Sequence, residues 1–443
     1  MAAKPLCSRG GLALAVAVGL SLIASACSSG SNGGTGTGSG SAGPANVTLW
    51  SWAPDLQSEV NVCQKADPKI HITLVNAGTG APEYQKLRTA MRADSGVPDL
   101  VQLAYAEVPG FVATNSLADI SKLGANSLKA DYTAAAWANV SDGSKVYGLP
   151  WDSGPMAILY REDILSKYHI AVPTTWAAFA QAAVALHKAD PGAYLTAFTP
   201  NEPLWFEALM WQAGSRPFIV SGKKLTVAIN DAAAMKVANY WDQLIRTGAL
   251  SIQPDYTTDW YTDLDNGTLA SWVTAAWGPS FLQGVAGKST GLWRAAPLPQ
   301  WTAGATASSE YGGSTIAIPA QSKNQAAAYT VLKCLLNGNT STVMFTTKQL
   351  LFPSKKSILN SASFTGEKSA FYGDTPVNQI FVQASADVVP GWEWSPIQDY
   401  VSQQLTAEIS ASAAKGDIAS ALNQVQAQVV AYAKQQGFQV TSG

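Results

Sequence analysis

Aromatic side chains stand beside a few polar ones at several places where a short apolar segment of this sequence ends. These places are Ser51 with Trp52, Tyr105, Trp151 with Asp152, residues 277–281 and residues 311–314. Aromatic rings bind ligands through their apolar faces, and neighbouring carboxylate and hydroxyl groups bind them by hydrogen bonding. A catalytic nucleophile would need a base and an orienting group beside it, and no such set accompanies these rings. The residue types therefore predict a binding protein and not an enzyme.

A serine motif and an acidic run offer other chemistry, but their context does not fit. Residues 287–291 match G-x-S-x-G, yet a nucleophile elbow must follow a strand and no clear strand precedes this segment. A phosphate-binding loop would need a glycine five positions before Gly287, where the chain has Leu282. The acidic run 263–267 lacks the period and final glutamate of a calcium loop, and the three histidines lack the spacing of metal ligands. We expect a surface turn at 287–291, no metal and no cofactor.

The sequence alternates predicted strands with predicted helices. Strands are expected at 47–52, 70–75, 99–103, 147–150, 156–160, 269–276 and 315–318. Helices are expected at 55–65, 83–92, 161–168, 232–247 and 324–336. A further helix is expected to start at 173–176 with a threonine cap, and two or three more follow from Ile397 onward. This alternation is typical of an α/β fold with a mostly parallel sheet. Ligands bind beyond the carboxyl ends of strands in such sheets, where the aromatic residues stand.

The N-terminus has the pattern of a secretory signal. Lys4 and Arg9 precede an apolar run that begins at Leu12 and ends in small residues before Cys27. The segment 22–27 resembles a bacterial lipobox, and by that resemblance Cys27 is the lipidated first residue of the mature chain. The alternative is an ordinary signal with a chance cysteine. We therefore expect a signal peptide at 1–26 and a flexible, lipid-anchored tether at 27–45, which is rich in Ser, Gly and Thr.

Length and charge narrow the class of partner. Removing the signal leaves about 420 residues, enough for two or three domains. It also removes Lys4 and Arg9, which changes the formal net charge from −2 to −4. A weakly acidic chain without a basic run does not fit nucleic-acid binding. No later apolar run approaches the roughly 20 residues of a spanning helix, so the mature protein is expected to be anchored at the membrane without crossing it.

Four cysteines are present, and two remain able to pair after processing and lipidation. Cys7 leaves with the signal and Cys27 carries lipid, which leaves Cys63 and Cys334 in an oxidising compartment. We predict a disulfide between them. Two separate buried thiols are the alternative.

Motifs along nearly the whole mature length resemble one protein family. They include 47–52 (VTLWSW), 97–102 (VPDLVQ), 146–155 (VYGLPWDSGP), 159–163 (LYRED), 173–176 (PTTW), 277–279 (WGP) and 312–314 (GGS). In this order and spacing, behind a lipobox, they resemble the bacterial extracellular solute-binding proteins of ABC importers, in particular the carbohydrate-binding group that includes maltose-binding protein.

The resemblance implies an α/β fold of two lobes that close like a clamshell, of the type II class of periplasmic binding proteins. The chain then crosses between the lobes three times, near 152–155, 311–314 and 353–358. Residues 46–152 with 314–357 are expected to form the first lobe, and residues 153–313 with 358–443 the second. On this map the predicted disulfide lies within the first lobe and leaves the hinge free.

The resemblance also implies a carbohydrate ligand, and the number of aromatic residues suggests an oligosaccharide. The residues expected to bind it are Ser51, Trp52, Tyr105, Trp151, Asp152, Trp205, Phe281, Gly312, Gly313 and Trp394. The implied partners are the permease subunits of an importer, and the binding protein itself is expected to be a monomer outside the cytoplasm. The alternatives are a secreted carbohydrate-active hydrolase, which would use two opposed carboxylates, a solute-binding protein for a peptide or polyamine, and a surface adhesin.

Overall fold

The computed structural model describes residues 44–348 and 351–443. The predicted signal peptide, the lipidation site Cys27 and nearly all of the predicted tether lie outside these residues. The tether prediction reached one residue too far, because the first strand already begins at Ala45. Within the described part of the chain, no helix combines the length and the apolar character needed to span a bilayer.

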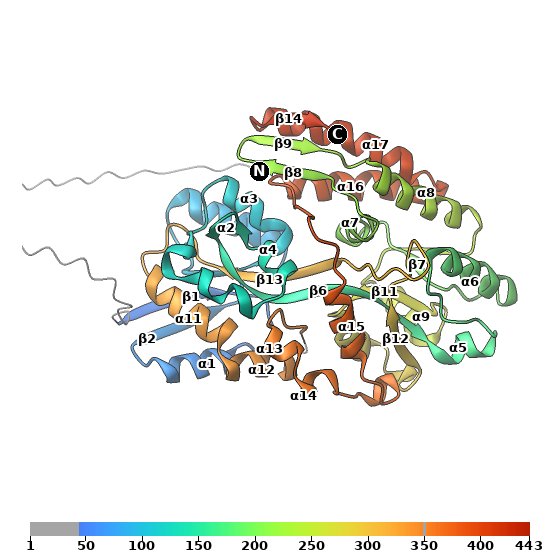
Figure 1. Cartoon of the computed structure of the whole chain (residues 1–443), viewed down its shortest axis with the longest axis horizontal. Helices are drawn as coiled ribbons and strands as arrows, with labels where there is room; N and C mark the ends of the chain where they lie inside the picture. Colours follow the sequence, from blue (N-terminus) through green and yellow to red (C-terminus); the bar gives the residue numbers. More distant parts are fainter. Residues whose placement is uncertain (1–43, 349–350) are drawn as a thin grey trace, which may run out of the picture. The chain divides into compact units, whose positions relative to one another are not determined.

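A seven-stranded sheet organises the fold (Figure 1). Its strands are β1 (Ala45–Trp50), β2 (Ile70–Val75), β3 (Leu100–Ala104), β6 (Gly148–Arg161), β11 (Ser271–Ala275), β12 (Trp293–Pro297) and β13 (Glu310–Ala317). They lie in the order β11-β6-β13-β3-β1-β2, with β12 also paired to β6. Strand β1 runs parallel to β2 and β3, whereas β13 is antiparallel to β3 and β6, and β11 and β12 are antiparallel to β6. The expected mostly parallel sheet is therefore wrong, and the sheet is mixed.

Strand β6 is a single strand of 14 residues, where the sequence predicted two short ones. Gly154 and Pro155 suggested a break. Instead, Gly154 passes so close to the carbonyl group of Tyr311 on β13 that a side chain at this position would collide with it. The glycine thus permits close contact between two strands and does not end one. As a result β6 extends from the β1–β3 side of the sheet to β11 and β12, as Figure 1 shows.

Two groups of helices surround the two ends of β6. What we call the first lobe contains α1 (Gln57–Ala66), α2 (Ala81–Ala93), the 3-10 turn η1 (Tyr105–Glu107), α3 (Val108–Ala113), α4 (Ala134–Ala138), α11 (Gln325–Asn337) and α12 (Asn339–Lys348). The second lobe contains α5 (Glu162–Lys167), α6 (Trp176–Ala189), α7 (Pro203–Gln212), α8 (Ala232–Arg246), α9 (Thr258–Asn266), α10 (Gly278–Val285), α15 (Val377–Ala386), α16 (Gln398–Ser412) and α17 (Ile418–Gln435). A small sheet of β8 (Phe218–Ser221), β9 (Lys224–Val227) and β14 (Gln439–Ser442) belongs to it, as does the pair β7 (Ala197–Phe198) and β10 (Ser251–Ile252). Between the lobes, α13 (Lys356–Leu359) and α14 (Ala362–Thr365) follow the segment that bridges to Asp152 through Pro353.

Strands β6 and β13 pair irregularly where they pass between the lobes. Their register shifts between Glu310 and Gly313 and again between Ser314 and Thr315. Gly312 and Gly313 have φ of 81° and 91°, and a Cβ on Gly313 would come within 2.8 Å of the Tyr105 ring. Both glycines are therefore required by the backbone at this point.

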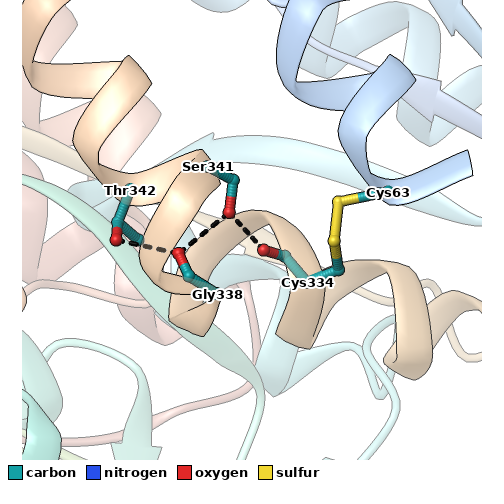
Figure 2. Close-up of a disulfide and its surroundings, with 5 residues drawn as sticks. All are labelled: Cys63, Cys334, Gly338, Ser341 and Thr342. Carbon is teal, nitrogen blue, oxygen red and sulfur yellow. Dashed lines mark hydrogen bonds between the residues drawn. A yellow bond between two sulfur atoms is a disulfide. The ribbon is translucent and has the colours of Figure 1, made fainter. Parts of the chain in front are cut away.

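The predicted disulfide is confirmed. Cys63 of α1 and Cys334 of α11 are bonded with their Cα atoms 5.8 Å apart, and both helices belong to the first lobe (Figure 2). Beside the bond, the Ser341 hydroxyl of α12 donates to the carbonyl of Cys334, so α12 also contacts this site. The crosslink thus ties an early and a late segment of the chain together without bridging the two lobes.

Candidate functional site

Five residues of the second lobe and the hinge form what we call the Tyr311 cluster: Glu202, Tyr256, Trp277, Phe281 and Tyr311. Four of them lie at or next to the end of an element, and Phe281 lies within a helix that follows one. Glu202 precedes α7, Tyr256 lies two residues before α9, Trp277 follows β11, Phe281 lies on α10 and Tyr311 lies on β13. The cluster therefore gathers at element ends, the region where ligand sites are expected in α/β proteins.

Hydrogen bonds centred on Tyr311 fix the geometry of the cluster. Its hydroxyl donates to Glu202 Oε2 at 2.7 Å and lies 3.1 Å from the Tyr256 hydroxyl. Its carbonyl accepts from Trp277 Nε1 at 2.9 Å, and the two ring centroids are 5.0 Å apart. Tyr311 itself is buried, but Glu202, Tyr256 and Trp277 are half-buried and the Phe281 ring is 48% exposed. The cluster thus presents partly exposed rings beside a carboxylate held in one orientation.

The electrostatic environment of the cluster disfavours extra negative charge. Burial raises the pKa of Glu202, although the Tyr311 hydroxyl lowers it in part. Burial also raises the pKa of the neighbouring Asp255 to about 7, with a further contribution from the Glu202 carboxylate, while Asn201 Nδ2 donates to it at 2.7 Å. A group of this kind is suited to accepting hydrogen bonds from neutral hydroxyl groups.

Predicted residues of the first lobe lie on a hydrogen-bonded chain that leads to the hinge. Ser51 Oγ donates to Gln102 Oε1 at 2.7 Å, and the Trp52 amide donates to the same oxygen at 3.2 Å. Gln102 Nε2 donates to Ser314 Oγ at 3.0 Å, and Ser314 in turn donates to Asp152 Oδ1. Ser51 and Asp152 are buried, and burial raises the pKa of Asp152. These two polar side chains connect the end of β1 to β6 and β13.

Two predicted aromatic residues of the first lobe are also buried. Tyr105 is 1% exposed, its ring packs against Gly313, and its hydroxyl lies 3.3 Å from Ser354 Oγ. Trp151 is buried with its ring centroid 5.4 Å from that of Phe345. Only Trp52 among the predicted first-lobe aromatics is half-buried, against the edge of Tyr84.

The predicted residues of the second lobe lie in three different places: the core, the contact with the first lobe, and the Tyr311 cluster with the hinge strand. Trp205 is buried in the core and its indole donates to the Val273 carbonyl at 3.0 Å. Trp394 is buried too, and its indole donates to Asn139 Oδ1 of the first lobe at 3.1 Å. Phe281 lies in the Tyr311 cluster, and Gly312 and Gly313 lie on the hinge strand next to it. The predicted set is therefore spread over both lobes and includes one member of the cluster.

The remaining cluster residues differ in how clearly the sequence marks them as site residues. Trp277 and Tyr311 follow or lie on predicted strands and belonged to the aromatic set named from strand ends. Glu202 precedes a proline at a helix start, which is a weak signal. Tyr256 adopts a left-handed φ of 57° before α9, and nothing in its neighbours marks it. Gln102 was missed because it lies inside an apolar strand.

A cavity of about 450 Å³ is lined by α4 of the first lobe and by second-lobe residues of α15 and the segment after it, and one lining residue, Asn139, bonds to Glu310 of β13. Glu310 precedes Tyr311, so the two side chains point to opposite faces of the strand. Glu310 Oε2 accepts from Asn139 Nδ2 at 3.1 Å, and Asn139 lines the cavity together with α13, α15 and Trp211 and Trp392, whose rings stack 5.1 Å apart. Burial raises the pKa of Glu310 to about 8. The two faces of one strand therefore carry different kinds of surface.

The G-x-S-x-G segment does not form a nucleophile elbow. It follows helix α10, and its serine, Ser289, is 1% exposed and donates to the Ala286 carbonyl. The expected surface turn is confirmed, because residues 287–289 form a 3-10 turn with Gly287 and Lys288 exposed, and only the Ser289 side chain points inward, where its hydroxyl accepts from Trp293 Nε1. Among residues 44–348 and 351–443, no cluster of three His, Cys, Asp or Glu side chains has the geometry to bind a metal ion.

Known proteins share this fold over about nine tenths of the chain. The ABC transporter associated binding protein of B. animalis subsp. lactis Bl-04, solved in complex with beta-1,6-galactobiose, is 27% identical; the comparison covers 89% of this chain and 99% of that chain with a TM-score of 0.78. The galacto-N-biose-/lacto-N-biose I-binding protein of Bifidobacterium longum is 24% identical, with 91% and 100% covered and a TM-score of 0.80. The expected two-lobed clamshell is thereby confirmed.

Sequence comparison gives a consistent result. The arabinooligosaccharide-binding protein of Bacillus subtilis (strain 168) is 23% identical over 248 residues, which is 54% of this chain and 56% of that protein, so the match spans about half the length of the curated relative. A model of the bacterial extracellular solute-binding proteins matches residues 50–337. Because that match covers more than half of the sequence, this chain belongs to the bacterial extracellular solute-binding protein family.

Proposed function

We propose that this protein captures an oligosaccharide outside the cytoplasm and delivers it to the permease of an ABC importer. The observation that supports this most directly is the Tyr311 cluster. A pyranose ring has an apolar face of C–H groups and a rim of hydroxyls, and the cluster offers partly exposed rings next to a fixed carboxylate.

The relatives support the choice of ligand class. The structural neighbour at 27% identity was solved with beta-1,6-galactobiose, and the curated relative is an arabinooligosaccharide-binding protein. Both ligands are short, neutral oligosaccharides. A site whose carboxylates, Glu202 and Asp255, accept from the neutral donors Tyr311 and Asn201 suits a neutral polyhydroxylated ligand better than an anionic one.

Capture is proposed to occur by closure of the two lobes about β6 and β13. We retain the lobe boundaries inferred from the sequence, namely 46–152 with 314–357 and 153–313 with 358–443. The irregular pairing near Gly312 and Gly313 supports this placement of the hinge, since broken register allows local bending.

Anchoring through lipid on Cys27, after removal of residues 1–26, is also part of the proposal. The lipobox-like segment and the tether support it. Changing Cys27→Ala should release the protein from membranes or leave it unprocessed, as fractionation would show. A Cys27→Ala variant that is matured and retained like the wild type would exclude this anchor.

The ligand class is tested by calorimetry on a panel of β-1,6-galactobiose, lacto-N-biose, arabino-oligosaccharides, a peptide and a polyamine. We expect binding to at least one of the sugars. Binding to the peptide or polyamine alone would establish the non-sugar alternative. Incubation with a labelled oligosaccharide separates the hydrolase alternative, because a carrier binds stoichiometrically without product whereas a hydrolase turns over.

The position of the site is tested by Trp277→Ala, with Trp301→Ala as the matched control. Truncating a buried aromatic anchor costs about 2 kcal/mol or more, so the affinity for a sugar of the panel should fall roughly 30-fold. Trp301 is also a half-buried tryptophan of the second lobe but packs on Trp176 and Tyr240, outside the cluster. Equal loss of affinity in both variants, or none in Trp277→Ala, would place the site elsewhere.

A further inference from the structure

Helix α2 of the first lobe carries an arginine that touches the second lobe. Arg88 Nη1 lies 2.5 Å from Asp399 Oδ2 in the first turn of α16, and Arg88 Nη2 lies 3.3 Å from Glu107 Oε2 in η1. The side chains of Arg88, Glu107 and Asp399 are 31%, 12% and 46% exposed. One cation therefore holds together two carboxylates that belong to different lobes.

We propose that Arg88 is a positioning residue for ligand capture, whose guanidinium joins Glu107 and Asp399 and so holds the two lobes together. The inference rests on the proposed function, because it assigns these residues to the closure by which the ligand is retained. Opening the lobes at this point must separate Arg88 from Asp399.

The guanidinium is held in place on its own lobe. Its Cζ atom lies 4.7 Å from the centroid of the Phe111 ring of α3, in addition to the contact with Glu107. Contacts on two sides restrict the side chain before it meets Asp399. An arginine fixed in this way loses less conformational entropy on forming the interlobe pair than a free surface side chain would.

The backbones approach closely at the same place. Helix α16 packs against η1, and a Cβ on Gly110 of α3 would lie 3.3 Å from the Pro396 carbonyl. The ion pair therefore lies within a contact between the lobes and is not an isolated surface bridge. The other two ion pairs in the part of the chain that the structure describes, Arg161–Asp163 and Arg294–Glu162, each lie within the second lobe.

The charge balance explains why the arginine is required. Burial and, to a smaller extent, the nearby Asp399 carboxylate raise the pKa of Glu107 to about 8, although Arg88 opposes the shift. Without the guanidinium, two acidic groups would face each other across the lobes. Loss of Arg88 should thus remove the attraction on Asp399 and leave Glu107 protonated, and the Arg88→Asp substitution should in addition place a negative charge opposite Asp399 that favours opening.

The inner end of η1 connects this contact to the hinge. Tyr105 begins η1, and its ring packs against Gly313 of β13. Glu107 ends the same turn and contacts Arg88. Movement of η1 relative to α16 is therefore expected to accompany movement at the hinge glycines.

The test uses four variants of the full-length protein: Arg88→Asp, Asp399→Arg, the double charge swap, and Arg92→Asp as control. Arg92 lies one turn along the same exposed face of α2, and its guanidinium donates to Thr89 Oγ1 within that helix. The Arg92→Asp substitution therefore makes the same change of charge on the same helix, at a residue without a contact to the second lobe in the described interactions. Circular dichroism establishes that each variant folds.

Two readouts follow, one with and one without ligand. The dissociation rate of β-1,6-galactobiose, followed by tryptophan fluorescence, should rise about tenfold in each single variant, with the association rate changed less than threefold. The charge swap should restore this rate to within threefold of the wild type, and Arg92→Asp should leave it unchanged.

In ligand-free protein, X-ray scattering should show a larger radius of gyration for the single variants than for the wild type. Raising the salt from about 50 mM to about 500 mM should increase the radius of gyration only of the wild type, the charge swap and the control, because only these have the ion pair to screen.

The outcomes separate the two proposals. Single variants that match the wild type in both readouts, or a folded charge swap that restores neither, would overturn the role of Arg88. If the wild type does not bind β-1,6-galactobiose, that ligand is wrong, and the ligand-free scattering still decides whether the pair holds the lobes together.

Discussion

The two faces of β13 differ in how their polar groups are satisfied. On one face, the Tyr311 hydroxyl and carbonyl bond to Glu202 and Trp277, and the surrounding rings remain partly exposed. On the other, Glu310 is 1% exposed, its Oε2 accepts from Asn139 and its Oε1 has no partner among the described residues. Neighbouring residues of one strand therefore have different roles. Tyr311 contributes to a partly exposed surface suited to a ligand, whereas burial of the Glu310 carboxyl group lowers the stability of the folded protein.

The largest expected effect that distinguishes the faces is electrostatic. A carboxyl group whose pKa is near 4.5 in the unfolded chain and about 8 in the folded one makes the native protein lose stability as pH rises between these values. Glu310→Gln keeps an acceptor for Asn139 but cannot ionise. Its free energy of unfolding should match the wild type near pH 4.5 and exceed it by roughly 5 kcal/mol at pH 9, at about 1.4 kcal/mol per pKa unit.

Denaturant titrations of Glu310→Gln and the wild type across this pH range provide the measurement. Glu207 and Asp255 are also buried carboxyl groups whose pKa values are raised, to about 8 and about 7, so the wild type should lose stability through the same window. A Glu310→Gln variant whose stability falls with pH as steeply as that of the wild type would show that Glu310 is not the group that titrates.

The Cys63–Cys334 disulfide lies away from both faces of β13 and is expected to affect stability but not sugar affinity. Replacing both cysteines by serine should lower the free energy of unfolding by about 3 kcal/mol, because the native crosslink restricts the unfolded chain. Since the bond lies within the first lobe, the affinity for sugar should change less than twofold. Calorimetry and thermal unfolding on the same double variant decide this, and a large loss of affinity would mean that the first lobe is distorted as far as the binding surface.

A tryptophan on each face sharpens the contrast further. Trp392→Ala removes a ring stacked on Trp211 beside the cavity and should reduce stability by about 3 kcal/mol with little change in affinity. Trp277→Ala should do the reverse, weakening binding by about 2 kcal/mol with a smaller effect on unfolding. If the affinity responds to Trp392→Ala and ignores Trp277→Ala, the cavity face binds the ligand instead.

The sequence could predict elements whose patterns are local. Helix α8 was expected at 232–247 and spans Ala232–Arg246, and Thr175 caps α6 by accepting from the Ala178 amide. Strand β6 was divided wrongly because Gly154 and Pro155 look like a turn, and only the passage of β13 explains the glycine. The residues of the site were harder to predict for the same reason, because contacts between distant parts of the chain bring them together. Tyr256 and Glu202 meet Tyr311 through long-range packing, and neither position carries a local pattern that would identify it.

The smallest expected effect examines the hydrogen bonds of Tyr311 alone. Tyr311→Phe keeps the ring beside Trp277 and the carbonyl that accepts from its indole, but removes the hydroxyl that donates to Glu202. Glu202 then lacks the donor that orients it, and a hydrogen bond to a charged group contributes about 1.5 to 3 kcal/mol when both partners are buried. Because Glu202 is only half-buried and water can replace the donor, we expect a loss of about 1 kcal/mol of binding free energy, which is roughly a fivefold loss of sugar affinity by calorimetry.

Tyr256→Phe is the matched control. The Tyr256 hydroxyl contacts Tyr311 and not Glu202 in the described contacts, so this substitution should reduce the sugar affinity less. Equal losses in the two variants would mean that the orientation of Glu202 does not matter and that the cluster binds through its rings alone.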